Sequence, residues 1–310
     1  MTTADTVRDA LHAEFHAHGL LSADTDALTA PPDLLPRVLA LSFPEYDLAS
    51  QDIDVVFEST EERARIEQAL LFGWATADVL APTATDDRSH LLCALFNLGI
   101  GMIDSFCDTD PQRGAALLEF VQSLDVESAA SGPWQQGRML ASLPVGAAAD
   151  PTIAFTARVI DAFYSVLHAT HPLSVRRYVG HLLAEALAAE QRSIARSSAG
   201  PDELLEASRN TSVLPFLIMA TLVKGDIDGA THLGEAMWRI DDLIDLDLDA
   251  HSGALNSLLL GGTPDRAVIE AVARDAADHL RAGIGTADGR HFLSFVHRYA
   301  RVTSESSSRY

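Results

Sequence analysis

The sequence predicts an all-α fold, a single bundle of about ten or more helices. Ala and Leu dominate the apolar residues, which make up 47% of the chain, and aromatic residues make up only 6%. Few segments are rich in β-branched residues, so the composition favours helices over strands. Apolar positions recur at helical spacing, no alternating run is long enough for a strand, and no repeat of solenoid length recurs.

Prolines and capping aspartates divide the first half of the chain. Residues 1–60 are expected to be an N-terminal segment that packs on the bundle or extends it, and residues 61–310 to form one domain, because no linker follows. Asp86 or Asp87 can cap one helix, and Pro111 can begin the next. In order, the predicted elements are helices at 7–18, 60–80, 90–108 and 111–124 and a loop of small residues at 128–132.

The second half of the chain is a run of helices whose starts are marked by proline. Pro151, Pro172 and Pro201 each stand where a helix can begin. Pro215 lies inside a predicted helix and is expected to kink it. In order, the predicted helices cover residues 151–168, 172–196, 201–222, 231–249, 264–282 and 288–302.

The chain is strongly acidic, with 44 Asp and Glu against 22 Lys and Arg, a formal charge of −22, and Lys224 as its single lysine. This charge argues against nucleic acid and against an anionic membrane surface as partners. No uncharged apolar run is long enough to predict a membrane span. Two cysteines are too few for a disulfide framework and no secretory signal is seen, so we expect a cytoplasmic protein.

Two acidic clusters stand at the ends of apolar helices. In the first, Asp104 and Asp108 are four residues apart, so their carboxylates are neighbours on one helix face. Residues 91–103 before them are mostly apolar, and two carboxylates at the C-terminal end of a buried helix repel each other and oppose its dipole. A bound divalent cation would compensate this charge.

The second cluster has five Asp among the nine residues that begin at Asp241. At about 100° per residue, Asp241, Asp245 and Asp249 form one stripe, and Asp242 and Asp247 point elsewhere. Leu and Ile occupy the positions between them, which is typical of a half-buried helix rather than of a solvated acidic tail.

Either acidic cluster alone is typical of a solvated helix face, but the two together, in a chain with one lysine, indicate a metal site. Oxygen-only ligands favour Mg²⁺, whose shell a substrate phosphate can complete. No His or Cys cluster has the spacing of zinc ligands. The Gly-rich nucleotide-binding loops and the Gly-x-Ser-x-Gly nucleophile turn are also absent.

At these residues the sequence resembles the bacterial class I terpene synthases, which implies a single-domain α-helical bundle with a central cavity. That family carries an Asp-rich motif on one helix and a second triad, (N/D)-D-(L/I/V)-x-(S/T)-x-x-x-E, on a facing helix. The segment that begins at Asp241 has the triad spacing, with Asp245 in place of Ser/Thr and Asp249 in place of Glu. The first motif is reduced from D-D-x-x-D to Asp104-x-x-x-Asp108.

Two further segments resemble the family at its diphosphate site. Arg209, which precedes the predicted kink, is similar to the arginine that senses diphosphate. Arg309-Tyr310 resembles the C-terminal Arg-Tyr pair that hydrogen-bonds diphosphate in bacterial members, and Arg298-Tyr299 is a competing match.

The resemblance implies Mg²⁺-dependent ionisation of an allylic prenyl diphosphate, followed by loss of a proton or capture of water to give a terpene. Asp104 and Asp108 would bridge one or two ions, and Asp241, Asp245 and Asp249 would bind another, giving three ions with diphosphate bound. Aromatic faces in a dry cavity would stabilise the carbocations. The candidate aromatic residues, each of which could equally be ordinary core, are Trp74, Phe96, Phe163, Phe216 and Trp238.

Among these enzymes the sequence looks most like the free-standing class I diterpene synthases of the terpentetriene and labdatriene types. This implies a C20 substrate, such as a bicyclic labdane- or clerodane-type diphosphate made by a class II diterpene cyclase as pathway partner. No D-x-D-D motif is present, so the chain itself is not expected to start a cyclisation by protonation. The resemblance alone suggests a homodimer.

Two other functions fit the same residues. A trans-prenyl diphosphate synthase, which elongates the chain, also carries a D-D-x-x-D motif, but this sequence lacks the paired Asp and second Arg of that family's first motif. The sequence also lacks a lysine-rich pocket for the diphosphate of a second substrate, because Lys224 is its single lysine. A non-enzymatic helical binding protein could hold a structural cation with the same Asp clusters.

Overall fold

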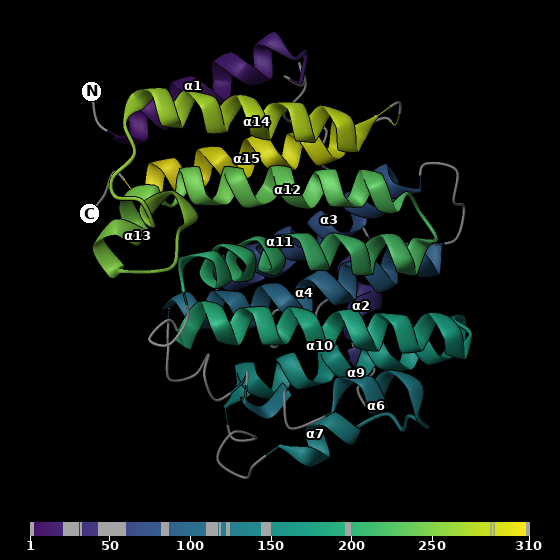
Figure 1. Cartoon of the computed structure of the whole chain (residues 1–310). Coiled ribbons are helices and arrows are strands. Elements are labelled where there is room, and N and C mark those ends of the chain that lie inside the picture. The colour runs from purple at the N-terminus through teal and green to yellow at the C-terminus, as the bar shows by residue number, and fades with distance from the viewer. Residues whose placement is uncertain are drawn as a thin grey trace. The chain divides into compact units, whose positions relative to one another are not determined.

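The computed structural model describes residues 3–20, 31, 33–42, 60–81, 87–109, 117, 119–121, 125–143, 150–195, 200–285, 287 and 289–307 (Figure 1). Throughout these residues every regular element is a helix, which confirms the predicted all-α class. In chain order they are α1 (Thr3–Ala17), α2 (Leu34–Ser42), α3 (Thr60–Leu80), α4 (Asp87–Thr109), α6 (Val126–Ser131), α7 (Arg138–Ser142), α9 (Pro151–Thr170), α10 (Leu173–Ala195), α11 (Pro201–Val223), α12 (Ile227–Ile244), α13 (Leu246–Ser252), η2 (Ser257–Leu259), α14 (Arg266–Ile284) and α15 (Arg290–Ser307).

Several predicted helix boundaries agree with the structure to within a few residues. The helix predicted at 60–80 has these bounds, and α9 begins at the predicted Pro151. The prediction of a loop at 128–132 is wrong, because these residues lie largely in α6. Asp125 caps that helix by accepting hydrogen bonds from the backbone N–H of Ser128 at 3.1 Å and from its hydroxyl at 2.6 Å. The helix predicted at 111–124 lies largely outside the described residues.

The chain folds into two compact units, each with its own core. The first comprises Met1–Leu28, Glu185–Ala220 and Asp226–Tyr310, and the second comprises Thr29–Ala184 and Thr221–Gly225. No described helix is both long and apolar enough to cross a membrane. The predicted domain limits, residues 1–60 and 61–310, stay a prediction.

In the second unit, α4 packs against α3 on one side and against α9 on another. Gly73 of α3 makes the approach to α4 close, because a Cβ at this position would stand 2.4 Å from the carbonyl oxygen of the buried Cys93. The side-chain amide of Asn97 in α4 donates a hydrogen bond of 2.8 Å to the carbonyl of Ala69 in α3. The helix that carries the first acidic cluster is therefore fixed to its neighbour by both packing and hydrogen bonding.

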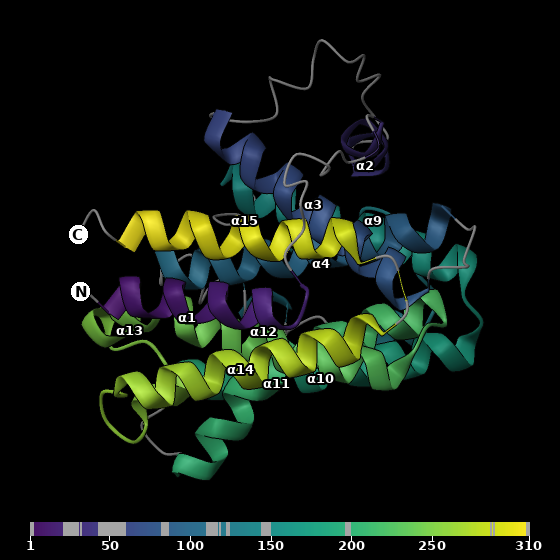
Figure 2. The same ribbon diagram turned by 90° about the horizontal axis from the view of Figure 1, so that it is seen from above.

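In the first unit, α12 runs beside α14, and α1 lies against both α14 and α15 (Figure 2). The apolar side of α12 is buried through Leu233, Ile240 and Leu243. Gly234 lets α12 approach α11, because a Cβ there would stand 2.6 Å from the Cα of Val213. The helix that carries the second acidic cluster is thus held on several sides, and its end is where the candidate site begins.

Candidate active site

The second acidic cluster spans the junction between two helices instead of lying on the single predicted helix at 231–249. α12 ends at Ile244, and Asp245 adopts φ −95° and ψ 4° before α13 begins. The backbone N–H of Asp245 still donates to the carbonyl of Asp241 at 3.0 Å, and that of Asp249 to the carbonyl of Asp245 at 2.8 Å. The break therefore preserves the four-residue spacing of the predicted ligands, and all three side chains are half-buried.

Asp241 accepts a hydrogen bond from a residue that is distant in the sequence. The hydroxyl of Tyr299 in α15 donates a hydrogen bond of 2.5 Å to Oδ1 of Asp241. The ring of Tyr299 is itself placed by stacking on Phe295, with ring centroids 6.0 Å apart and planes at 14°. Tyr299 belongs to the competing Arg-Tyr match, whereas Arg309 and Tyr310 lie outside the described residues, as does the side chain of Arg298.

Asn256 ties Asp249 to the end of α12, although no pattern in the sequence marks it for this role. Its buried side-chain amide donates to Oδ2 of Asp249 at 3.0 Å and to the backbone carbonyl of Asp242 at 2.7 Å. Its Oδ1 accepts from the backbone N–H of Leu258 at 3.0 Å. Asn256 therefore uses both ends of its amide to return the chain after α13 toward the acidic cluster.

Asp242 lies off the predicted ligand stripe and is buried. The backbone N–H of Ser257 donates to its carboxylate at 3.2 Å, and the Ser257 hydroxyl donates to the same oxygen. Burial raises the pKa of Asp242 to about 7; the Ser257 hydrogen bonds oppose this rise, and the charges of Asp241 and Asp249 add to it. Asp242 thus anchors the turn that supports Asp249.

The first acidic cluster lies where the sequence predicts, near the C-terminal end of one helix. Asp104 and Asp108 are both within α4, four residues apart. Their side chains lie outside the described part of the structure, and they belong to the compact unit that does not contain Asp241. The convergence of the two clusters on one metal site stays a prediction.

The second cluster offers only carboxylate oxygens, the donor type that Mg²⁺ prefers, and neutral hydrogen-bond donors hold two of its three carboxylates. Among the residues that the structure describes, no group of three His, Cys, Asp or Glu side chains is gathered closely enough to hold a metal by itself.

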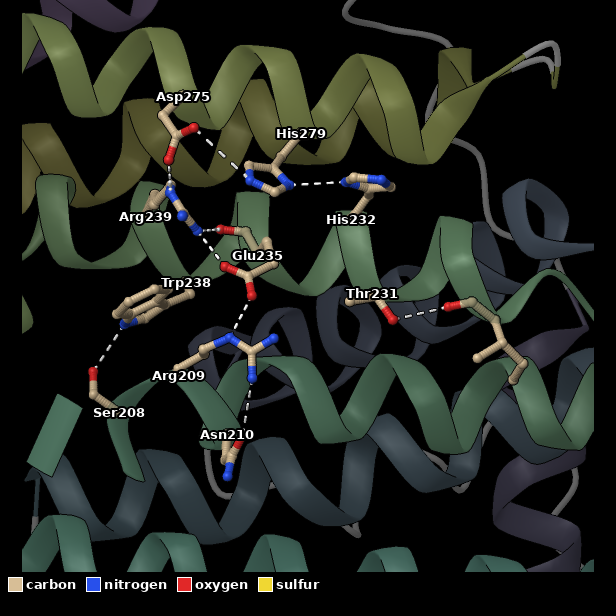
Figure 3. Close-up of polar contacts among 11 residues, drawn as sticks. Ser208, Arg209, Asn210, Thr231, His232, Glu235, Trp238, Arg239, Asp275 and His279 are labelled. Carbon is tan, nitrogen blue, oxygen red and sulfur yellow. Dashed lines mark hydrogen bonds and ion pairs between the residues drawn. The ribbon is translucent and has the colours of Figure 1, made fainter. Parts of the chain in front are cut away.

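Arg209 lies in a network of charged side chains that joins α11, α12 and α14 (Figure 3). Its Nε donates to Oε1 of Glu235, and its Nη1 donates to Oδ1 of Asn210 at 3.4 Å. Arg239 donates to the other carboxylate oxygen of Glu235 at 2.5 Å and also pairs with Asp275. Burial raises the pKa of Glu235, but the hydrogen bonds from Arg239 and Arg209 outweigh this and lower it, so Glu235 stays ionised.

The five candidate aromatic residues are divided between the two units. Phe96 and Phe163 are buried together with ring centroids 5.8 Å apart, and Trp74 lies 5.0 Å from the ring of His90. In the other unit, Phe216 is buried with its ring edge-on to a neighbouring Phe. The indole N–H of Trp238 donates to the hydroxyl of Ser208 at 2.9 Å. A shared cavity lined by all five stays a prediction.

The fold that these helices form is of the class I terpenoid synthase type. The crystal structure of linalool/nerolidol synthase from Streptomyces clavuligerus is similar, with a TM-score of 0.55 and 17% identity, over 89% of this chain and 99% of that chain. The structure of the same enzyme in complex with 2-fluorogeranyl diphosphate gives a TM-score of 0.50 and 17% identity, over 88% of this chain and 100% of that one. No protein-family model and no curated protein sequence matches.

Proposed function

We propose that this chain is a class I terpene synthase, an enzyme that ionises an allylic prenyl diphosphate with the help of Mg²⁺. The observation that carries the proposal is the end of α12, where three Asp side chains follow one another at ligand spacing and Tyr299 contacts the first of them. The likeness to an enzyme whose structure holds 2-fluorogeranyl diphosphate supports the same substrate class.

The chemistry of the proposed site follows from charge. Mg²⁺ held at this site would supply Lewis-acid stabilisation of the diphosphate leaving group. Asp241, Asp245 and Asp249 would hold one ion, and Asp104 and Asp108 one or two more. This chain is too acidic to attract a diphosphate by its own field, so its carboxylates serve by recruiting the cations that do.

Arg209 would bind the diphosphate directly, because a guanidinium offers a planar donor edge to phosphate oxygens. Arg309-Tyr310 is the Arg-Tyr pair proposed to close over the diphosphate, and the contact between Tyr299 and Asp241 supports Arg298-Tyr299 as the alternative pair. Trp74, Phe96, Phe163, Phe216 and Trp238 are the aromatic residues proposed to stabilise carbocations.

For the finer assignment we keep a C20 substrate, as the sequence resemblance implies. The structurally similar enzyme is named for linalool, a C10 alcohol, and nerolidol, a C15 alcohol. C10 and C15 diphosphates are therefore the main alternatives to a C20 substrate. A homodimer, a class II cyclase as pathway partner and a cytoplasmic location belong to the same proposal.

Incubation of the purified protein with C10, C15 and C20 allylic diphosphates and with a copalyl-type bicyclic diphosphate, followed by mass spectrometry, tests the proposal. A terpene hydrocarbon or alcohol is expected with Mg²⁺ and no product with EDTA. Activity that persists in EDTA, or no product from any of these substrates, would contradict the proposal. Addition of isopentenyl diphosphate separates the alternative, because a chain-elongating synthase would release a longer diphosphate.

Asp104→Ala and Asp241→Ala are each expected to abolish turnover while the helical circular dichroism signal is retained. The matched control is Asp247→Ala, which removes a carboxylate from the same acidic segment but from outside the ligand stripe. Equal loss in all three variants would indicate a general effect of charge, and retained turnover in Asp241→Ala would exclude the assigned site.

A further inference from the structure

We infer that Glu235 is a positioning residue that holds Arg209 by one edge of its guanidinium and leaves another edge to bind the diphosphate. The inference rests on the proposed function, in which Arg209 meets the substrate, and it adds a residue of α12 that lies six positions before the ligand stripe. It is carried by the geometry of the charged network in Figure 3.

The guanidinium of Arg209 is only partly used by the protein. Glu235 accepts from Nε, and Asn210 accepts from Nη1 at the long distance of 3.4 Å. Within the described residues, Nη2 has no hydrogen-bond partner, and the Arg209 side chain is 38% exposed. A guanidinium held at Nε can still present its two Nη groups to phosphate oxygens.

Glu235 can hold Arg209 firmly because Glu235 is itself fixed. Its side chain is only 10% exposed. Nη1 of Arg239, one turn further along α12, donates both to the backbone carbonyl of Glu235 at 2.9 Å and to Oε2 at 2.5 Å. The two oxygens of the carboxylate therefore accept hydrogen bonds from two different arginines. Rotation of the Glu235 carboxylate would break at least one of these charge-assisted bonds.

Arg239 has more partners than Arg209 and is less exposed, 19% against 38% of its side chain. Its Nε pairs with Asp275 of α14, its Nη1 is taken by Glu235, and its guanidinium lies over the ring of Trp238 at 5.0 Å. Asp275 supplies a second carboxylate to Arg239, so the two arginines and the two carboxylates of the network balance in charge. What Arg209 offers a diphosphate is therefore its remaining N–H donors.

The backbone at Arg209 is also held to α12. The preceding residue, Ser208, is buried and accepts a hydrogen bond of 2.9 Å from the indole N–H of Trp238. Two successive residues of α11 are thus attached to α12, one through Trp238 and the other through Glu235. The position of Arg209 is defined before any anion binds, which reduces the ordering cost of binding.

Calorimetric titration of the full chain with inorganic diphosphate in the presence of Mg²⁺ tests the inference. Glu235→Gln keeps the shape of the side chain and removes its charge, and Glu235→Asp keeps the charge but withdraws it from Arg209. Both are expected to weaken diphosphate binding by about tenfold or more. Glu270→Gln is the matched control, because it breaks an exposed Arg–Glu pair in α14 and is expected to leave binding unchanged.

A double-mutant cycle separates positioning from a merely structural effect. In an Arg209→Gln background, Glu235→Gln is expected to cause no further loss of diphosphate affinity, because its effect passes through Arg209. A full additional loss in that background, or unchanged binding in both Glu235 single variants, would overturn the inference and leave the proposed function standing. Absence of Mg²⁺-dependent diphosphate binding in the wild-type chain would overturn both.

Discussion

Tyr299 of α15 donates a hydrogen bond of 2.5 Å to Asp241 of α12, although the two residues are 58 positions apart in the sequence. The bond brings the last helix of the chain to the first Asp of the ligand stripe. A neutral hydroxyl at a ligating carboxylate can orient it without competing for the cation. The contact therefore makes the C-terminal helix a part of the candidate active site.

Removing the Tyr299 hydroxyl should have a small effect on the free energy of unfolding and a clear effect on the Mg²⁺ requirement for turnover. Tyr299→Phe is expected to cost about 1 kcal/mol of unfolding free energy and to raise the Mg²⁺ concentration for half-maximal turnover by about tenfold or more. Turnover measured against Mg²⁺ concentration checks this. Tyr178→Phe, at an exposed position of α10, is the control. An unchanged Mg²⁺ requirement would show that the bond is structural only.

Asn256 should matter to folding even without metal, because its buried amide satisfies groups on both sides of the α13 turn. Asn256→Ala is expected to lower the unfolding free energy in EDTA by about 1–3 kcal/mol, the cost of leaving buried polar groups unpaired. Asn256→Asp should cost more, since it sets a carboxylate against Asp249. Asn210→Ala, which removes only a 3.4 Å bond at a half-buried position, provides the comparison in denaturant titrations. Equal costs in the Asn210 and Asn256 variants would contradict the assignment.

Two helical glycines in the α3–α4 pair should respond in opposite directions to the same substitution. Gly73→Ala forces a Cβ to within 2.4 Å of a backbone carbonyl oxygen and should destabilise the fold by about 1–3 kcal/mol. At Gly101, an added Cβ meets nothing closer than the Cβ of Ala69 at 3.8 Å. Gly101→Ala should therefore stabilise the fold by about 0.5–1 kcal/mol, because it reduces the backbone entropy of the unfolded chain. Thermal or denaturant unfolding measures both, and the same sign in both variants would refute the packing argument.

Acid should destabilise the attachment of the N-terminal segment to α15. Nε2 of His297 lies 3.1 Å from the carbonyl of Leu20, and burial lowers the pKa of His297 below its usual 6.5, against the effect of that hydrogen bond. A lowered folded-state pKa means that the unfolded chain takes up the proton first. The stability that His297 contributes is therefore present above pH 6.5 and lost as the pH falls through the folded-state pKa.

His297→Gln retains an amide donor for Leu20 and removes the titration. Its unfolding free energy should fall less between about pH 7 and pH 5 than that of the wild type. His181→Gln, at an exposed position of α10, should retain the wild-type dependence. Identical pH profiles for wild type and His297→Gln would assign the acid sensitivity to other groups.

The helices could be predicted from the sequence because their signals are local. Pro151 and the helical period define their starts and faces without reference to distant residues. Two predictions are wrong locally. A capping hydrogen bond accepted by Asp125 places most of the expected loop of small residues in α6. The chain also leaves α12 at Asp245, which makes no side-chain capping bond, without breaking the four-residue spacing. The acidic stripe could be recognised because its period survives that change of helix.

The supporting residues of the site could not be predicted, because their partners are distant in the sequence. Asn256 looks like an ordinary turn residue until the fold places it against Asp249. Glu235 carried a usable signal, since an acidic residue on the buried side of an apolar helix, four positions before Arg239, must be paired. The identity of its second partner, 26 residues earlier in the chain, required the structure.

The residue of α4 whose backbone lies against Gly73 also carries a thiol. Cys93 is fully buried beside that contact, and burial raises the pKa of its thiol far above the ordinary range, so a thiolate does not form in the folded chain. Alkylation at this one sulfur, followed by peptide mass spectrometry, therefore reports how often the buried thiol becomes accessible to solvent. The alkylation rate thus measures local opening in the compact unit that carries Asp104.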